Sequence, residues 1–501
     1  MKPSAFYLTA SRISLLLFVC TAWVCGCMAP TSIPLSQVYN RAAKSHIRNP
    51  VVLVHGLGGS LLRDKADGNV VWGAFSGIGI NANSRQGIQK LALPVKAAKA
   101  RDFGHEDISG LSDTIQASGP LHKIRLNVLG ISMAVDVYRQ ILQTLGVGGF
   151  RDQTVAAGQI DYGTDHYTCF TFFYDWRKDI VTNARELDRF LEQTADYVAA
   201  EDARRGIRRK KVRFDLVAHS LGGLIARYYL RYGTEDVCLP DRVPEVAWKG
   251  AGRISRLIMI GPPNTGSVKT LEALLEGHKI SWILPKFQPA LISTFPSFYQ
   301  LLPRPRHRIF LDEKKERKSL DLYDVNLWME NQWGIFSDSQ EPYLRYLLPG
   351  ADAPEKIAAK YVGAALERAR RMHAALDQKP RTACPSEIYL FTSKSIPTEQ
   401  LVGLSRRSGR LQMDFRGFDL KAPGDGTVTA ANAMGDERQG RPWRPWVRTA
   451  IPLESVYLIQ GDHLAITKSP RFTDNLLHLL LEMPPPEGPE NILAPAGNDL
   501  F

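Results

Sequence analysis

Short apolar runs recur along most of the chain, each bounded by glycine, proline or polar residues. The first is Val51–Val54, which follows Pro50 and stops at His55-Gly56. Five more runs of this kind lie at residues 167–174, 212–218, 254–260, 387–391 and 455–459. Such short runs, rich in branched aliphatic residues, are typical of parallel strands that are covered on both faces.

Amphipathic segments separate several of these runs. Apolar residues recur at helical spacing from Ala134 to Leu145, from Ala184 to Val198 and from Ala358 to Ala369. Each stripe is wide enough for one face of a helix packed on a core. The alternation of strands and helices predicts an α/β fold with a mostly parallel, doubly wound sheet.

Residues 265–378 interrupt this alternation, because their apolar patches are punctuated by several prolines. We interpret this segment as a cap, or lid, inserted into one domain that spans residues 50–483. A chain of 501 residues is long enough for a single large domain with insertions. Residues 484–501 are rich in proline and glycine, which predicts a disordered tail.

The first 27 residues are typical of an export signal. Ile13–Val24 is an apolar run of 12 residues, too short to cross a bilayer but suited to a signal-peptide core. Val24-Cys25-Gly26-Cys27 resembles a bacterial lipoprotein cleavage box, with Cys27 as the lipidated residue; a simple signal peptide cut nearby is the alternative. We expect an exported protein, anchored to a bacterial membrane through Cys27 on a polar tether of residues 28–49, or otherwise periplasmic or secreted.

Composition adds few restrictions. Apolar residues make up 44% and charged residues 23%, as in ordinary globular proteins, and the net charge is +12. The densest basic stretch, residues 204–211, favours a solvated helix end, with attraction to anionic lipid headgroups as the alternative. No nucleic-acid-binding module is recognisable. Cysteine and histidine spacing indicates neither a metal site nor a disulfide framework, although Cys238 and Cys384 could pair.

The most informative motif is Ala218-His219-Ser220-Leu221-Gly222, which joins the 212–218 run to a helical segment. A strand, a sharp turn bearing serine and a helix together form the nucleophile elbow of α/β-hydrolases. The small residues around Ser220 suit a strained turn that holds the hydroxyl clear of the sheet. A structural turn is the alternative interpretation.

A serine nucleophile needs a base, and the base needs an orienting acid, in the chain order Ser, Asp or Glu, His. Asp425 lies in a glycine-rich turn, and His463 follows the 455–459 run, where ligand sites of open α/β sheets form. Asp462 and Asp436 are the alternative acids. His219, His373 and His478 fit this order or placement less well.

An oxyanion hole is the remaining requirement. One donor is expected to be the backbone N–H of Leu221, directly after the nucleophile. The other is expected from the exit of the first strand, where glycines flank Leu57 and allow the backbone to approach a reacting carbonyl closely.

Several motifs occur together in one order along the chain. They are Asn49-Pro50-Val51-Val52-Leu53-Val54-His55-Gly56-Leu57-Gly58-Gly59-Ser60, Tyr174-Asp175-Trp176-Arg177, Ala218-His219-Ser220-Leu221-Gly222-Gly223, Gly261-Pro262-Pro263-Asn264-Thr265-Gly266-Ser267, Pro296-Ser297-Phe298-Tyr299-Gln300-Leu301-Leu302-Pro303, Ile396-Pro397-Thr398 and Gly424-Asp425-Gly426-Thr427-Val428. The set, which spans about residues 49 to 465, resembles the lecithin:cholesterol acyltransferase-like family of α/β-hydrolases, in a bacterial-type form.

The resemblance implies Ser220, Asp425 and His463 as a triad, Leu57 and Leu221 as oxyanion donors, and a lipid ester as acyl donor. It also implies a lid or membrane contact near Trp72 and Phe75. Asp175, Trp176 and Arg177 either shape the acyl pocket or hold a loop through an ion pair. The resemblance implies no cofactor.

The resemblance favours transfer of the acyl group to an alcohol. Hydrolysis by a lipase, phospholipase or esterase is the alternative, because the elbow motif serves both reactions. A non-catalytic envelope lipoprotein on a hydrolase scaffold is a remote third hypothesis, since a fold alone does not establish activity.

Overall fold

The computed structural model describes residues 48–75, 83–120, 123–128, 131–136, 138–153, 166–238, 244–279, 286–437, 448–483, 485–486 and 492–493. The predicted signal peptide, Cys27 and almost all of the predicted tether lie outside these residues. So does most of the predicted tail, of which Ile492–Leu493 (β20) pairs with Arg208–Arg209 (β9).

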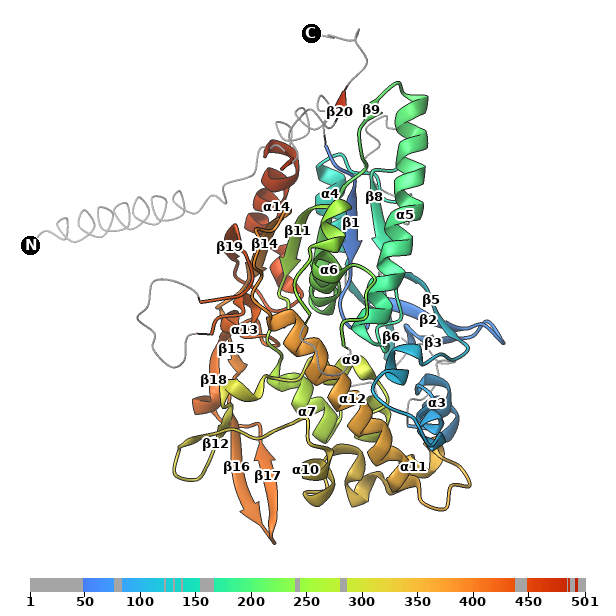
Figure 1. Ribbon diagram of the computed structural model, residues 1–501, viewed down its shortest axis with the longest axis vertical. Coiled ribbons are helices and arrows are strands. Elements are labelled where there is room, and N and C mark those ends of the chain that lie inside the picture. Colours follow the sequence, from blue (N-terminus) through green and yellow to red (C-terminus); the bar gives the residue numbers. More distant parts are fainter. Residues whose placement is uncertain are drawn as a thin grey trace, which may run out of the picture.

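Six parallel strands form the central sheet, in the order β19-β14-β11-β10-β1-β8. Their bounds are β1 Val51–Val54, β8 Cys169–Phe172, β10 Phe214–His219, β11 Ile254–Ile260, β14 Glu387–Thr392 and β19 Ser455–Leu458. Each coincides with one of the six apolar runs, so the predicted strands are confirmed. Figure 1 shows β19, β14, β11, β1 and β8 side by side in the upper half of the molecule.

Helices cover both faces of the sheet, so that side chains of successive strand residues, which point to opposite sides, are buried on either face. In β1, Val51 and Leu53 pack with α4 (Arg139–Val147) and α14 (Pro470–Leu477). Val52 and Val54 pack on the other face with α5 (Ile180–Arg204) and α6 (Leu221–Tyr232). The doubly wound α/β architecture is therefore confirmed.

One predicted helix begins later than its apolar stripe suggests. Ile131–Asp136 forms strand β7, which pairs with β6 (Lys123–Val128), and the helix starts only at Arg139. The stripe that starts at Ala134 thus mixes two elements. The prediction failed there because a branched, apolar stretch is compatible with a strand as well as a helix.

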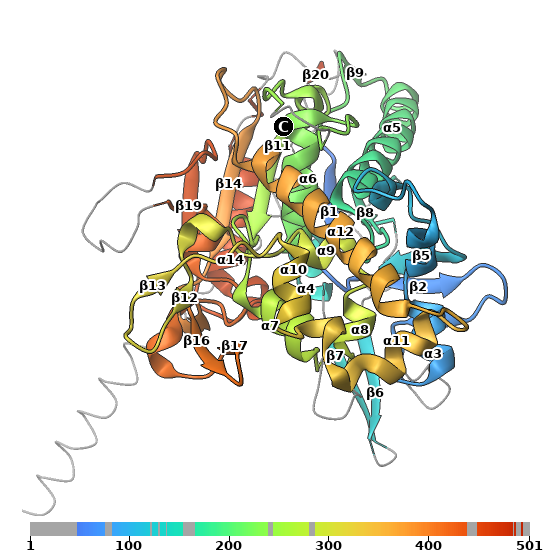
Figure 2. The same ribbon diagram turned by 60° about the horizontal axis from the view of Figure 1, so that its bottom comes forward.

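The segment between β11 and β14 contains α7 (Val268–Glu276), α8 (Pro289–Ile292), α9 (Pro296–Tyr299), α10 (Val325–Glu330), α11 (Glu341–Leu347) and α12 (Pro354–Asp377), with the short strands β12 (Phe310–Leu311) and β13 (Arg317–Lys318). Prolines begin α8, α9 and α12 rather than breaking them, since the first helical N–H has no partner to lose. In Figures 1 and 2, α7, α10, α11 and α12 lie together beyond one end of the sheet.

Smaller elements complete the fold. They are β2 (Ser60–Asp64), β3 (Val70–Trp72), β4 (Ala74–Phe75), β5 (Ile115–Pro120), β15 (Ile396–Glu399), β16 (Val402–Arg407), β17 (Arg410–Asp414), β18 (Lys421–Gly424), α3 (Arg85–Leu91) and α13 (Ala430–Met434). The cysteines at 169, 238 and 384 are free thiols, so the conceivable Cys238–Cys384 pair is not formed. None of the helices in the described part of the chain combines the length and the apolar content that a bilayer crossing requires.

Candidate active site

Ser220 occupies a strained turn between β10 and α6. Its φ of 53° and ψ of −122° lie in a region that non-glycine residues rarely adopt. The turn packs closely on the exit of β1: a Cβ added to Gly222 would lie 2.4 Å from the His55 carbonyl oxygen, and one added to Gly56 would lie 2.7 Å from the Ser220 Cβ. These contacts leave room only for glycine and present the serine at the carboxyl end of the sheet.

Asp425 and His463 are in direct contact. His463 Nδ1 lies 2.8 Å from Asp425 Oδ2, while Asp425 Oδ1 accepts backbone N–H groups from Thr427 at 2.9 Å and Val428 at 2.7 Å. Burial by itself would raise the pKa of Asp425, but the His463 ring and the two N–H donors outweigh it and lower that pKa. The buried group is therefore a carboxylate that orients the imidazole.

Gly261, at the end of β11, makes this contact possible. Its φ is +54°, and a Cβ at this position would lie 3.0 Å from Asp425 Oδ2 and 3.2 Å from His463 Nδ1. Any side chain here would press on the acid–base pair. This function was not inferred from the sequence, although Gly261 opens one of the motifs quoted above.

Ser220, Asp425 and His463 all line one cavity of about 610 Å³. Within the described part of the chain the Ser220 hydroxyl makes no hydrogen bond, so serine and imidazole share the cavity without a bond between them. In substrate-free hydrolases the serine and the histidine are often farther apart than a hydrogen bond allows.

The alternative acids and histidines are engaged elsewhere. Asp462 accepts N–H groups from Leu464 and Ala465 and so holds the His463 loop rather than the ring. Asp436 accepts the N–H of Arg448. His373 is buried against Tyr323, and His478 pairs with Glu482.

His219 has a larger role in the site than its position next to Ser220 in the sequence suggested. Its Nε2–H donates to the His463 carbonyl oxygen at 2.9 Å, and its Nδ1 lies 3.1 Å from the Tyr138 hydroxyl. That hydroxyl accepts the N–H of Gly56 at 2.7 Å and therefore donates its own proton to His219. Burial, and then the proximity of His463, lower the pKa of His219 to about 3, which keeps the ring neutral. The chain Gly56–Tyr138–His219–His463 thus links the exit of β1 to the imidazole loop.

The expected oxyanion donors flank the serine. Leu57 is 36% exposed at the cavity wall, beside Gly58, whereas Leu221 is fully buried as the first residue of α6. Among the described residues, neither backbone N–H has a hydrogen-bond acceptor. Neither N–H group is therefore already occupied by another acceptor in this part of the chain.

Aromatic side chains make the cavity apolar. Trp72 and Trp176 pack with ring centroids 4.8 Å apart, and each also contacts a phenylalanine of the inserted segment, Phe287 or Phe295. The side chain of Phe75 lies outside the described part of the structure. Walls of this kind suit an aliphatic chain.

Asp175 and Arg177 do not line the cavity. Arg177 is fully buried and binds Asp175 through two nitrogens, Asp113 by an ion pair and the Leu91 carbonyl oxygen. They hold the segment that carries Leu91 and Asp113 against the start of α5, so the ion-pair interpretation fits Asp175 and Arg177, whereas Trp176 lines the pocket. In the described part of the chain, no three His, Cys, Asp or Glu side chains gather as metal ligands would.

The parallel sheet, the strained serine turn and the Asp425–His463 pair place the chain among the α/β-hydrolases. Residues 132–333 match the sequence model of the lecithin:cholesterol acyltransferase family. The resemblance drawn from the motifs is thereby confirmed over that segment, which supports an enzyme that acts on lipid esters.

Other comparisons are weaker. The crystal structure of the Tle4–Tli4 complex is similar with a TM-score of 0.48 and 12% identity, over 87% of this chain and 98% of that one. The mature form of the lipase BlEst2 of Bacillus licheniformis is similar with a TM-score of 0.30 and 12% identity, over 87% of this chain and 93% of that one. EstA of Clostridium botulinum is similar with a TM-score of 0.31 and 14% identity, over 88% of this chain and 90% of that one. A comparison with curated protein sequences gives no match.

Proposed function

We propose that the protein is a serine acyl-transfer enzyme that takes an acyl group from a lipid ester, with Ser220 as nucleophile, His463 as base and Asp425 as orienting acid. The observation that carries the proposal is the carboxylate-bound imidazole beside a strained serine in an apolar cavity of about 610 Å³. The cavity provides space for an aliphatic chain next to the reacting oxygen.

The hydrogen-bond pattern sets the direction of proton transfer. Because ionised Asp425 can only accept, the proton between the two residues belongs to His463 Nδ1. His463 Nε2 then has a lone pair for the Ser220 proton. As that proton moves, the serine oxygen bonds to the ester carbonyl carbon; the leaving alcohol later takes the proton from Nε2, and an acyl-serine remains.

The N–H groups of Leu57 and Leu221 are the proposed donors to the oxyanion that forms in this step. Each is free of a competing acceptor among the described residues, so neither must break a bond to act. Loss of one such donor typically costs about 3 kcal/mol of transition-state stabilisation.

An alcohol or water must then attack the acyl-serine. We favour an alcohol, because the family match is to an acyltransferase and the cavity walls near Ser220 are largely aromatic and aliphatic. Such walls disfavour water relative to an apolar alcohol. Hydrolysis, with water as the main acceptor, is the alternative reaction.

Labelling with a fluorophosphonate tests the nucleophile. Wild type should be modified at Ser220, and Ser220→Ala should show no labelling. Ser267→Ala is the matched control, since Ser267 lines the same cavity but donates to the Thr427 carbonyl oxygen, and it should still be labelled to completion. A folded wild type that resists the reagent would favour the non-catalytic scaffold.

The fate of the acyl group tests the acceptor. Purified protein is incubated with an acyl-labelled phospholipid, with and without a long-chain or sterol alcohol. A new labelled ester that forms only with the alcohol supports transfer, whereas labelled free fatty acid alone in both mixtures identifies a hydrolase.

We also propose export and attachment to a bacterial membrane through Cys27, which brings the enzyme to its lipid substrates. The support is the apolar run and cleavage box in the sequence. Metabolic labelling with a radioactive fatty acid should mark wild type, and Cys27→Ser should abolish the label and release the protein from membranes. A signal peptide without lipidation would leave both proteins unlabelled.

A further inference from the structure

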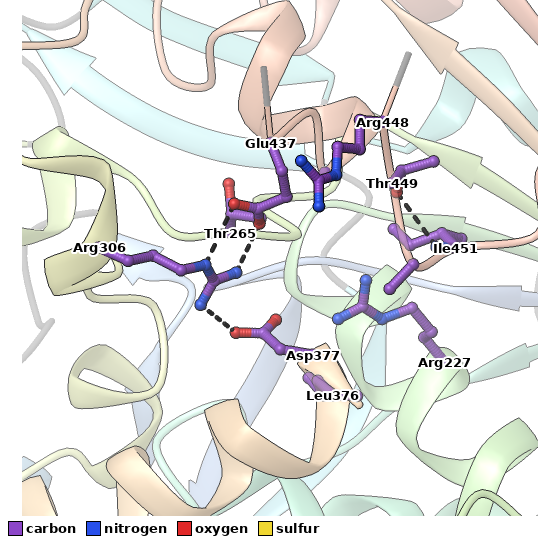
Figure 3. Close-up of a pocket in the computed structure, with 11 residues that line it drawn as sticks. Arg227, Thr265, Arg306, Leu376, Asp377, Glu437, Arg448, Thr449 and Ile451 are labelled. Carbon is purple, nitrogen blue, oxygen red and sulfur yellow. Dashed lines mark hydrogen bonds and ion pairs between the residues drawn. The ribbon is translucent and has the colours of Figure 1, made fainter. Parts of the chain in front are cut away.

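A second cavity, of about 340 Å³, lies apart from the one at Ser220, and five of the eleven residues that line it are charged. It is formed by the middle of α6, the end of α12, the loop after β11, the segment between α9 and β12, and residues that follow α13. Figure 3 shows the guanidinium groups of Arg227, Arg306 and Arg448 directed toward the space between these elements. The proposed acyl-transfer reaction uses none of these groups.

Arg227 is the unusual member of this cavity. It is only 2% exposed, and its Nε and Nη2 atoms are buried without a hydrogen-bond partner. Burial, and then the proximity of Arg231, lower the pKa of Arg227 to about 9. The charge of nearby Asp377 offsets part of this effect, but no acceptor satisfies the two buried nitrogens, which is destabilising, so the site is electrostatically incomplete as it stands.

The carboxylates of the cavity are already committed. Asp377 binds both Arg304 and Arg306, at 2.9 and 2.7 Å. Glu437 binds Arg306 and His307. Neither acid is hydrogen-bonded to Arg227 or to the guanidinium of Arg448 in the described part of the chain, so these two cations remain for a ligand.

Positive charge therefore exceeds negative charge around this space. Three guanidinium groups line it with two carboxylates, and Arg231 and Arg304 add further positive charge close to Arg227. The side chains that carry the excess positive charge approach the cavity from different directions. Planar guanidinium groups bind the oxygens of phosphate in pairs, and several of them can share one tetrahedral dianion.

We propose that this cavity is a binding site for a phosphate group, with Arg227 and Arg448 as its principal donors. Its volume of about 340 Å³ is roughly ten times the ~30 Å³ that one water molecule occupies in the liquid. The space therefore holds a small phosphomonoester or a lipid headgroup as readily as a free phosphate ion.

The site is physically separate from the acyl-transfer chemistry. Arg227 follows Ser220 by seven residues on the same helix, a rise of about 10 Å. The phosphate site is also independent of the proposed reaction, because phosphate binding requires neither the serine nor the imidazole. Ser220→Ala should bind phosphate as wild type does.

The first test uses Arg227→Met, which removes the charge and keeps a long side chain. In phosphate-free buffer of fixed ionic strength, this variant should unfold at a higher temperature than wild type, because a buried unpaired cation is gone. Added inorganic phosphate should raise the unfolding temperature of wild type and leave that of the variant unchanged. A purely structural arginine would give the opposite result: lower stability of the variant in both buffers.

Isothermal titration calorimetry with inorganic phosphate gives the affinity. Arg227→Met and Arg448→Gln should each weaken binding by at least about tenfold, since each removes a charged donor. Arg471→Gln is the matched control, because Arg471 is an exposed arginine on α14, and it should bind as wild type. Absence of saturable binding by wild type, or equal binding by Arg227→Met, would overturn the proposal, subject only to the vesicle result below.

The source of the phosphate is settled by two further ligands. Glycerol phosphate tests a soluble ester, and vesicles of phosphatidylglycerol are compared with vesicles of phosphatidylcholine for a headgroup. Binding of either soluble ligand that is lost in Arg227→Met supports a free-metabolite site. Binding confined to phosphatidylglycerol vesicles and lost in Arg227→Met supports a headgroup site. Binding to neither soluble ligands nor vesicles refutes both.

Discussion

Replacement of Asp425 by asparagine should invert the proton arrangement of His463 without removing a hydrogen bond. Asp425 Oδ1 accepts two backbone N–H groups, at 2.9 and 2.7 Å, and Oδ2 faces the imidazole at 2.8 Å. The asparagine oxygen must take the Oδ1 position, because an NH₂ group there would face two donors. Its NH₂ group then faces His463 Nδ1.

The consequence is a base in the wrong tautomer. Nδ1 of His463 must accept from the new amide, so the ring proton moves to Nε2. An Nε2–H cannot take the Ser220 proton. In serine hydrolases this tautomer change lowers kcat by about 10⁴, equivalent to about 5 kcal/mol of transition-state stabilisation.

The assay is kcat on a chromogenic ester, together with the rate of fluorophosphonate labelling. Asp462→Asn is the matched control, since Asp462 Oδ1 only accepts the N–H groups of Leu464 and Ala465, and an asparagine oxygen can do the same. The control should stay within about threefold of wild type, because it leaves the tautomer unchanged. An Asp425→Asn enzyme within tenfold of wild type, or a larger loss in Asp462→Asn, would refute the assignment of the acid.

Three further expectations follow from the same contacts. Gly261→Ala should lower stability by about 1–2 kcal/mol in urea denaturation and reduce kcat, because its φ is +54° and its Cβ would press on the acid–base pair; unchanged values would contradict this packing. Tyr138→Phe leaves the buried Gly56 N–H and His219 Nδ1 without partners, which should cost about 1–3 kcal/mol and lower kcat more than it changes KM. Burial lowers the pKa of His55 to about 4, and burial together with nearby His463 lowers the pKa of His219 to about 3. In the unfolded chain each histidine has a pKa of about 6.5, so between about pH 6.5 and 5 the two rings gain protons only when the protein unfolds. Stability should therefore fall on acidification from about pH 6.5 to 5, with a slope that rises toward about 1.4 kcal/mol per pH unit for each histidine; urea midpoints that are constant over this range would contradict their burial in the neutral form.

Local sequence determined the sheet and the serine turn. The six strands could be located because a parallel strand buried on both faces needs an uninterrupted apolar run, and that signal lies within a few neighbouring residues. Ser220 was identifiable for a similar reason, since strand, small residues and helix are contiguous. The helical periodicity gave a wrong prediction only from Ala134 onward, where a strand and a helix share one apolar stripe.

Tertiary structure decided the contacts between segments that are distant in the chain. Asp462 is adjacent to His463, yet it is Asp425, 38 residues earlier, that reaches the imidazole, because the local turn commits Asp462 to backbone N–H groups. The bond from His219 to the His463 carbonyl oxygen spans 244 residues. The unpaired state of Arg227 likewise depends on which acids the packing of α6 and α12 leaves within reach. Periodicity and turn chemistry are encoded by near neighbours, whereas the partner of a buried charge is chosen only when the elements pack.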